Sequence, residues 1–194
     1  MTDQRKTKEG RILKKAAEGD ANAIRHLVKA HSDLAYTVAV KLLDNPEDAE
    51  EVVQDSFMKA FVSLNRFKNS SKFSTWLYRI VYNTALTKIK KRTRGLSFRE
   101  DLPADIGGLQ VRNKGWEELL KSEKLKYIDM AMNGLSEEDR LIFTLHYTGG
   151  KTISEINGIL NLKKSAIKMR LSRGRKLLKV RLELLLGNET KELL

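Results

Sequence analysis

Apolar residues recur at intervals of three and four along almost the whole chain, and this periodicity limits the possible folds more than any other feature. The run of Leu34, Val38 and Leu42 shows it, and so does the pair Leu77 and Val81. Such spacing places apolar side chains on one face of an α-helix. Only two prolines interrupt the 194 residues. We therefore expect an all-α protein.

The helical periodicity fades between Gly95 and Gly115, a stretch that contains Pro103 and few spaced apolar residues. A loop of this length is unusual inside a compact domain, so a flexible linker between two small helical domains explains it better. We expect a first domain over 10–94, a linker over 95–115, a second domain over 116–186, and a frayed tail over 187–194.

Composition narrows the class of protein. Lys and Arg number 37 against 25 Asp and Glu, a net charge of +12, so we expect an anionic partner such as nucleic acid. With no cysteine, disulfides, thiolate nucleophiles and Cys-based zinc sites are excluded. His26, His31 and His146 are isolated, so we expect no catalytic residue, no metal and no cofactor. No stretch approaches the ~18 apolar residues of a membrane helix, which favours a cytoplasmic protein without membrane insertion.

The charge is unevenly distributed, and one segment is purely acidic. Residues 44–55 carry six carboxylates and no basic residue. Asn45 can cap a helix there, Pro46 suits its first position, and Glu47 and Asp48 complement the positive end of the helix dipole. The apolar stripe of this helix leaves the carboxylates on its outer face. That face is either an ordinary solvated surface or a surface for a protein partner.

Two other segments are purely basic. Residues 66–94 carry nine cations, interleaved with aromatic residues that include Phe73, Trp76 and Tyr78. Cations can follow a phosphate backbone while aromatic rings stack on unpaired bases, so this segment favours single-stranded or melted nucleic acid. The alternative is that Trp76 and Tyr78 pack in or near the core. Residues 163–181 carry another nine cations and no acid.

The strongest local signal is a helix-turn-helix within residues 151–178. Thr152 and Glu155 form a capping box that starts a short helix, and Asn161 stands at the turn, where a left-handed backbone is required. On the following helix, Ile167 and Leu171 lie on the inward stripe that Gly174 and Leu178 continue. The outward face has cations and no acid, as the major groove of duplex DNA requires.

Three segments, in this order, resemble the extracytoplasmic-function (ECF) sigma factors of the sigma-70 family, the bacterial subunits that direct RNA polymerase to promoters. The acidic segment Asn45–Phe57 resembles the polymerase-binding helix of the family. The segment Phe73–Ile80 resembles its promoter-melting segment, and Leu135–Leu178 resembles its promoter-reading helix-turn-helix domain. Asn157 is a departure, because the family usually has Ala there.

The resemblance implies a function without bond chemistry and several partners. The chain would bind core polymerase, recognise the −35 and −10 promoter elements and promote DNA melting, and an anti-sigma factor is a further candidate partner. The clamp helices of the polymerase would contact Glu47, Asp48, Glu50, Glu51, Gln54 and Asp55. The −10 element would contact Lys68, Asn69, Ser70, Ser71, Lys72, Phe73, Trp76, Arg79, Asn83, Lys88, Lys91 and Arg92. The −35 element would contact Lys164, Ser165, Lys168, Met169, Ser172, Arg173 and Lys176.

Other functional classes stay open on the residues alone. A stand-alone helix-turn-helix repressor or activator would bind duplex DNA tightly as a dimer. A nuclease would need a set of Asp, Glu and His residues at metal-binding spacing, and the sequence offers none that is recognisable. Peripheral membrane attachment would need a large apolar counterface beside the basic helices, beyond what the cores require.

Overall fold

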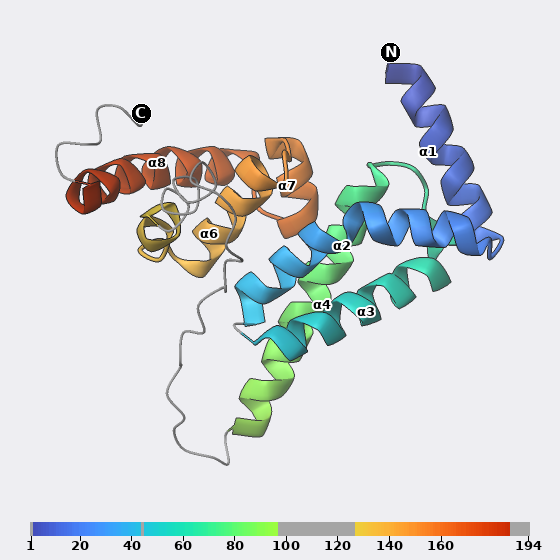
Figure 1. Ribbon diagram of the computed structural model, residues 1–194, viewed down its shortest axis with the longest axis horizontal. Helices are drawn as coiled ribbons and strands as arrows, with labels where there is room; N and C mark the ends of the chain where they lie inside the picture. Colours follow the sequence, from blue (N-terminus) through green and yellow to red (C-terminus); the bar gives the residue numbers. More distant parts are fainter. Residues whose placement is uncertain (1, 44, 97–126, 187–194) are drawn as a thin grey trace, which may run out of the picture.

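The computed structural model describes residues 2–43, 45–96 and 127–186, and every regular element within them is a helix. In chain order these are α1 (Thr2–Ala17), α2 (Ala21–Leu43), α3 (Pro46–Val62), the 3-10 turn η1 (Leu64–Arg66), α4 (Phe73–Leu96), α6 (Glu137–Phe143), the π-turn η2 (Thr144–Thr148), α7 (Ile153–Leu160) and α8 (Lys164–Leu186). A further helical stretch covers residues 127–132. The all-α prediction is confirmed over these residues (Figure 1).

A local capping signal starts helix α3. The Asn45 side chain accepts a hydrogen bond from the Asp48 backbone N–H at 2.7 Å, and Pro46 occupies the first turn of α3, as predicted. The helix α4 begins at Phe73.

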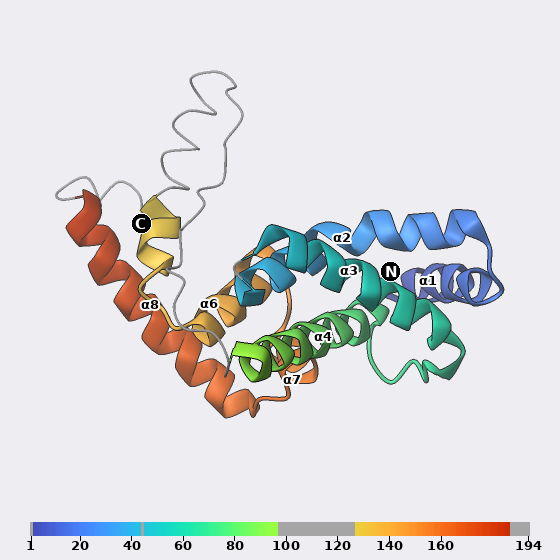
Figure 2. The ribbon, with the colours of Figure 1, turned by 90° about the horizontal axis from the view of Figure 1, so that it is seen from below.

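The N-terminal half is built on three mutually packed helices, α2, α3 and α4, with α1 lying against α2 and α3 (Figures 1 and 2). Val38, Val52 and Leu77 are almost fully buried where the three helices meet. Burying one such side chain contributes about 1.5–3 kcal/mol, so this core holds α3 and α4 in fixed relative positions. Their outer faces carry two of the three predicted binding surfaces.

The C-terminal half forms the predicted helix-turn-helix. Thr152 and Glu155 make both hydrogen bonds of a capping box, and Asn161 has the left-handed conformation at φ 57°. The Asn157 amide donates to the Leu162 carbonyl at 2.6 Å and so bridges the turn, which alanine at this position could not do. Ile156 and Ile167 bury the inner faces of α7 and α8.

The two halves of the chain pack against each other. α7 lies against α4, and α6 and η2 lie against α2 (Figures 1 and 2). Buried apolar side chains form one contiguous cluster that extends from Leu27 and Val81 in the N-terminal half to Leu145 and Ile156 in the C-terminal half. The sequence contained no signal for this arrangement.

Some predictions fall on residues that the structure does not describe. These include residues 97–115 of the predicted linker, the segment 116–126 of the predicted second domain, and the tail 187–194. Gly95 and Leu96 belong to α4, so the helix continues two residues past the predicted domain boundary. No helix among the described residues has the length and apolar character needed to cross a bilayer.

Candidate functional site

The outer face of α3 forms an acidic ridge with a groove on either side. The ridge carries all six predicted polymerase contacts; five are exposed and Asp48 is half-buried. Glu51 and Asp55 line a groove of about 410 Å³ toward α4, whereas Glu50 and Gln54 line a groove of about 450 Å³ toward α2. Charged groups therefore flank both grooves along one helix. This geometry suits docking of an extended partner more than binding of a small molecule.

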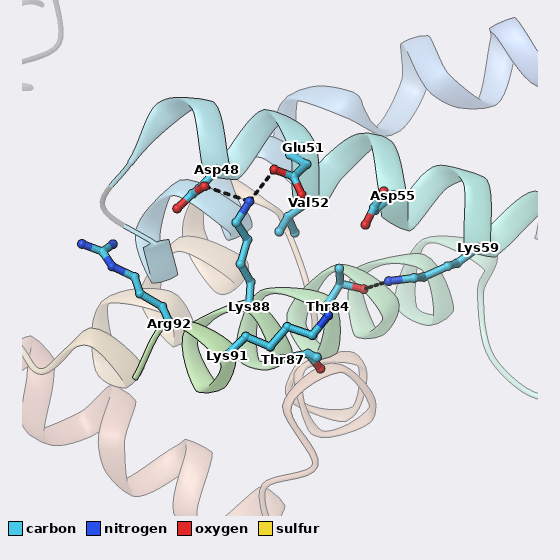
Figure 3. Close-up of a pocket in the computed structure, with 10 residues that line it drawn as sticks. All are labelled: Asp48, Glu51, Val52, Asp55, Lys59, Thr84, Thr87, Lys88, Lys91 and Arg92. Atoms are coloured by element: carbon cyan, nitrogen blue, oxygen red, sulfur yellow. Dashed lines mark hydrogen bonds and ion pairs between the residues drawn. The ribbon is translucent and has the colours of Figure 1, made fainter. Parts of the chain in front are cut away.

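Lys88, predicted to contact the −10 element, lies in the first groove and contacts the acidic ridge instead. Its Nζ is 2.8 Å from an Asp48 oxygen and 2.6 Å from a Glu51 oxygen (Figure 3). Hydrogen bonds to Asp48 and Glu51 raise the pKa of Lys88. In this conformation the ammonium is engaged by two carboxylates, so a phosphate contact by Lys88 would have to displace them.

The exposed −10 residues that remain on α4 divide between two sides of the helix. Lys91 and Arg92 line the same groove as Lys88 (Figure 3). Arg79 and Asn83 are exposed and, being four residues apart, share another face of the helix. One nucleic-acid strand following α4 would therefore meet Arg79 and Asn83 on a different side from Lys91 and Arg92.

The loop before α4 presents the other predicted −10 contacts. Residues 68–72 are all exposed, and Asn69 takes a left-handed conformation at φ 53°. Phe73, in contrast, is only 1% exposed and packs against Phe67 and Trp76 with ring centroids 6.1 and 5.9 Å away. Phe73 is thus a core residue in this structure and its ring cannot reach a base. Half-buried Trp76 presents only part of its ring.

The predicted −35 contacts form one continuous exposed surface on α8. Each of these seven residues is exposed, and Met169 keeps 53% of its surface accessible among the cations. Arg170, on the other side of the helix, forms ion pairs with Glu138 and Asp139 of α6, at 2.5 and 2.9 Å. These pairs hold α8 against its scaffold, and the charged residues among the seven −35 contacts are all cations.

An ion pair joins the predicted −10 loop of the N-terminal half to α7 of the C-terminal half. Lys72 Nζ lies 2.8 Å from Glu155 Oε1 of α7. Burial opposes ionisation of Glu155, but hydrogen bonds from Lys72 and from the backbone and hydroxyl of Thr152 outweigh it and lower its pKa to about 2. Glu155 therefore has two roles, as the capping residue predicted from sequence and as a partner for Lys72.

Lys151 makes a contact with α4 that the sequence did not predict. Its Nζ donates to the Ser74 hydroxyl at 3.0 Å and lies 5.0 Å from the centre of the Tyr78 ring. Tyr78 is 2% exposed, so the core-packing alternative holds for this residue, and burial, reinforced by Asp33, raises its pKa to about 12. Lys151 is one of 37 Lys and Arg residues, and no sequence pattern indicated that it would pack against Ser74 and Tyr78.

A metal-dependent site has no support in the described part of the chain. No group of three or more His, Asp or Glu side chains there is arranged to hold a metal ion. His31 Nδ1 lies 3.2 Å from the Tyr78 hydroxyl oxygen, a contact between α2 and α4.

Comparison with known protein families identifies both halves. The model for sigma-70 region 2 matches residues 27–95, and the model for sigma-70 region 4 matches residues 125–178. The first match includes the acidic ridge and α4, and the second includes the helix-turn-helix. Each matched segment therefore contains predicted binding residues.

Relatives agree over most of the chain. The ECF RNA polymerase sigma factor SigW of Bacillus subtilis is 28% identical over 189 residues, covering 88% of this chain and 94% of SigW. The ECF sigma-E factor of Escherichia coli K12 is 28% identical over 170 residues, covering 84% of this chain and 88% of that factor. Among solved structures, the sigma factor RpoE in complex with the anti-sigma factor NepR from Bartonella quintana has a TM-score of 0.67 at 22% identity, covering 82% of this chain and 96% of RpoE. The structure of CnrH in complex with the cytosolic domain of CnrY has a TM-score of 0.61 at 23% identity, covering 89% of this chain and 96% of the matched chain. These two likenesses concern the fold.

Proposed function

Because the chain belongs to the sigma-70 family and is an ECF sigma factor, we propose that it binds the core of bacterial RNA polymerase, recognises the −35 and −10 elements and promotes promoter melting. The observation that carries this proposal is the separation of charge on one chain: carboxylates gather on the outer face of α3, and cations on the outer faces of α4 and α8. The protein performs no bond chemistry in this scheme; it positions an enzyme.

Docking to polymerase would use the acidic ridge. Its carboxylates are exposed on a helix whose inner face is fixed by the core, so they present a preformed surface to a cationic partner. The grooves on either side could receive side chains of the clamp helices. Met58, 66% exposed on the same helix, would add apolar contact area.

Recognition of the −35 element would use the exposed face of α8 in the major groove. Arg173 and Lys168 can donate to base edges or phosphates, and a good bidentate base contact contributes about 1–3 kcal/mol of discrimination. Lys164, at the first turn of α8, adds charge for the phosphate backbone. The two ion pairs of Arg170 would keep the helix at a constant angle to its scaffold.

Melting would use the exposed loop over residues 68–72 with Arg79 and Asn83. Extruding a base from the duplex costs a few kcal/mol, which contacts to the unpaired strand must offset. Lys68 and Lys72 would follow the phosphates, and the exposed part of Trp76 could stack with a base for about 1–3 kcal/mol. We assign Phe73 to support of this loop from the core, and Lys88 to the acidic ridge.

We also propose a cytoplasmic location and an anti-sigma factor as a regulatory partner. The bacterial polymerase and chromosome are in the cytoplasm, so a protein that acts on both would work in the cytoplasm. The proposal of an anti-sigma factor is prompted by the fold shared with RpoE and CnrH, whose structures contain NepR and CnrY.

A charge-matched pull-down tests polymerase binding. Reversing Glu50 and Asp55 to Lys should abolish retention of core polymerase, because both side chains are exposed on the acidic ridge. Reversing Glu18 and Glu183 to Lys makes the same change in net charge on exposed residues elsewhere and should leave retention intact. Equal retention of both variants, or a palindromic footprint on duplex DNA without polymerase, would favour the stand-alone regulator.

Run-off transcription tests the complete proposal. With core polymerase and a promoter library, the parent chain should initiate from templates that share −35 and −10 sequences. Replacing Arg173 by Ala should lower initiation by about tenfold or more on preferred −35 sequences if it contacts a base. A uniform loss on all sequences would assign Arg173 to the phosphates, and absence of initiation by the parent would contradict the proposed function.

A further inference from the structure

Among the seven predicted −35 contacts on α8, Met169 is the apolar one. It keeps 53% of its surface accessible, and the other six contacts are lysines, serines and one arginine. Those six side chains can donate hydrogen bonds to phosphates or base edges, whereas the thioether of methionine is at most a weak acceptor. The exposure of Met169 therefore needs a different explanation from that of its neighbours.

Met169 lies at the centre of the outward face of α8. Ile167 and Leu171, 0% and 2% exposed, mark the buried stripe, and the helical period places Met169 directly opposite the middle of that stripe. Side chains of a helix tilt toward its N-terminus, so the Met169 thioether lies over the turn that contains Ser165 and Ala166. Both of these side chains are short, which leaves the thioether accessible to a partner that approaches this face.

The charges around Met169 indicate what kind of partner this is. Lys168 precedes it in the chain, and Arg173 lies one turn later on the same face. Among the described residues, the ion pairs of α8 involve Arg170 and Lys179, so Lys168 and Arg173 have no carboxylate partner there. An exposed apolar group between two such cations suits a polyanion that itself presents an apolar group.

Duplex DNA presents such a group in its major groove. Thymine carries a C5 methyl group beside its O4 acceptor, whereas guanine, adenine and cytosine present donors and acceptors of hydrogen bonds only. Methionine suits contact with a methyl group because its three rotatable bonds and polarisable sulfur adapt to an irregular surface. The flanking cations would contact the phosphates or the neighbouring bases.

We propose that Met169 selects a thymine in the −35 element by contact with the C5 methyl group of that base. This inference rests on the proposed function, because it places the outward face of α8 in the major groove. Burial of one methyl-sized group corresponds to about fourfold in affinity, or about 0.8 kcal/mol. Arg173 lies about 6 Å further along the helix axis, so it should contact a base within about two base pairs of the thymine.

Replacement of thymine by deoxyuridine tests this contact by removing a single methyl group. Duplexes would first be selected from a random library on the full-length chain, alone and with core polymerase, to find the position at which thymine is preferred. Deoxyuridine at that position should lower the affinity of the parent about fourfold in fluorescence anisotropy, because it pairs with adenine as thymine does but lacks the methyl group. Equal affinity of the parent for the two duplexes would overturn the inference.

Variants of Met169 identify the side chain that contacts the methyl group. The effect of deoxyuridine should disappear in Met169→Ala and persist in Met169→Leu, which keeps an apolar side chain. Met130→Ala is the matched control, because Met130 is also 53% exposed but lies in the helical stretch 127–132, outside α8. It should behave as the parent does. If the effect persists in Met169→Ala, or disappears equally in Met130→Ala, another group contacts the methyl and the inference is wrong.

The outcomes separate this inference from the proposed function. If the parent initiates run-off transcription with core polymerase but deoxyuridine changes neither binding nor initiation, the function stands and the thymine contact fails. If the parent does not initiate while the effect of deoxyuridine on binding depends on Met169, the contact stands and the proposed function fails. A parent that prefers thymine at no position, alone or with core polymerase, overturns the contact whatever its transcriptional activity.

Discussion

Gly174 offers a quantitative test of how α8 is held in place. It lies in the middle of the helix that carries the −35 surface, where glycine is unfavourable by about 1 kcal/mol relative to alanine. Its position is explained by Phe143 of α6, because a Cβ at residue 174 would lie 2.4 Å from the nearest ring carbon. The missing side chain allows the Phe143 ring to pack directly on the backbone of α8.

The expected effect of Gly174→Ala follows from two opposing terms. Helix propensity favours alanine by about 1 kcal/mol, whereas forcing a methyl group into a well-packed core costs about 1–3 kcal/mol. The net change in the free energy of unfolding should range from about zero to a loss of about 2 kcal/mol. Because Phe143 is 4% exposed, its ring has little room to move away.

Gly10 provides the matched control, because a Cβ there meets no atom of the described residues within 4 Å and only the helix-propensity gain applies. The two substitutions should therefore differ by about 1–3 kcal/mol, measured as urea midpoints followed by far-UV circular dichroism. Gly174→Ala should also weaken binding to −35 duplex, since it moves α8 on its scaffold. If Gly174→Ala stabilises the protein as much as Gly10→Ala, the close-packing explanation is refuted.

Two further predictions concern the charged groups that the structure brings together. Lys88→Gln should leave the salt dependence of binding to a −10 single strand unchanged. Lys72→Gln should lower the slope of log K against log salt concentration by about 0.7, the value for one phosphate contact to a single strand. An equal effect of the two substitutions would assign Lys88 to the DNA-binding surface. Burial, together with the nearby charges of Lys151 and His26, lowers the pKa of His31 from 6.5 to about 4. Between these values the unfolded chain binds a proton that the folded chain does not, so stability should fall as the pH drops from 6.5 to 4 and level off below. Urea midpoints at pH 7 and pH 5 should differ more for the parent than for His31→Asn, and identical differences would contradict the assignment to His31.

Most of the local architecture could be predicted from the sequence. The Asn45 cap, the Thr152–Glu155 capping box and the left-handed Asn161 all lie where the residue pattern indicated. Each depends on atoms three or four residues apart, so the information is contained within one short segment. The exposed face of α8 was predictable for the same reason, because the helical period assigns each residue to a side.

Assignments within the −10 set could not be made from local pattern. Phe73 was predicted to contact the −10 element, but it is buried in a cluster of three aromatic rings with Phe67 and Trp76. Lys88 and Lys91 are both lysines of the basic segment 66–94. Of the two, only Lys88 contacts Asp48 and Glu51, across the groove between α3 and α4. An aromatic or basic residue on a helix has no local feature that distinguishes these environments.

By itself, the sequence determined the helices, their caps, the turn before α8 and the division of charge among three segments, because these features depend on neighbours within one or two helical turns. Only the tertiary structure decided that Lys72 meets Glu155, that Lys151 reaches Ser74 and that the start of α4 is covered by α7. Ser74 and Lys151 are 77 positions apart along the chain. Contacts over such separations depend on how whole faces pack, and no short-range periodicity encodes which face will meet which.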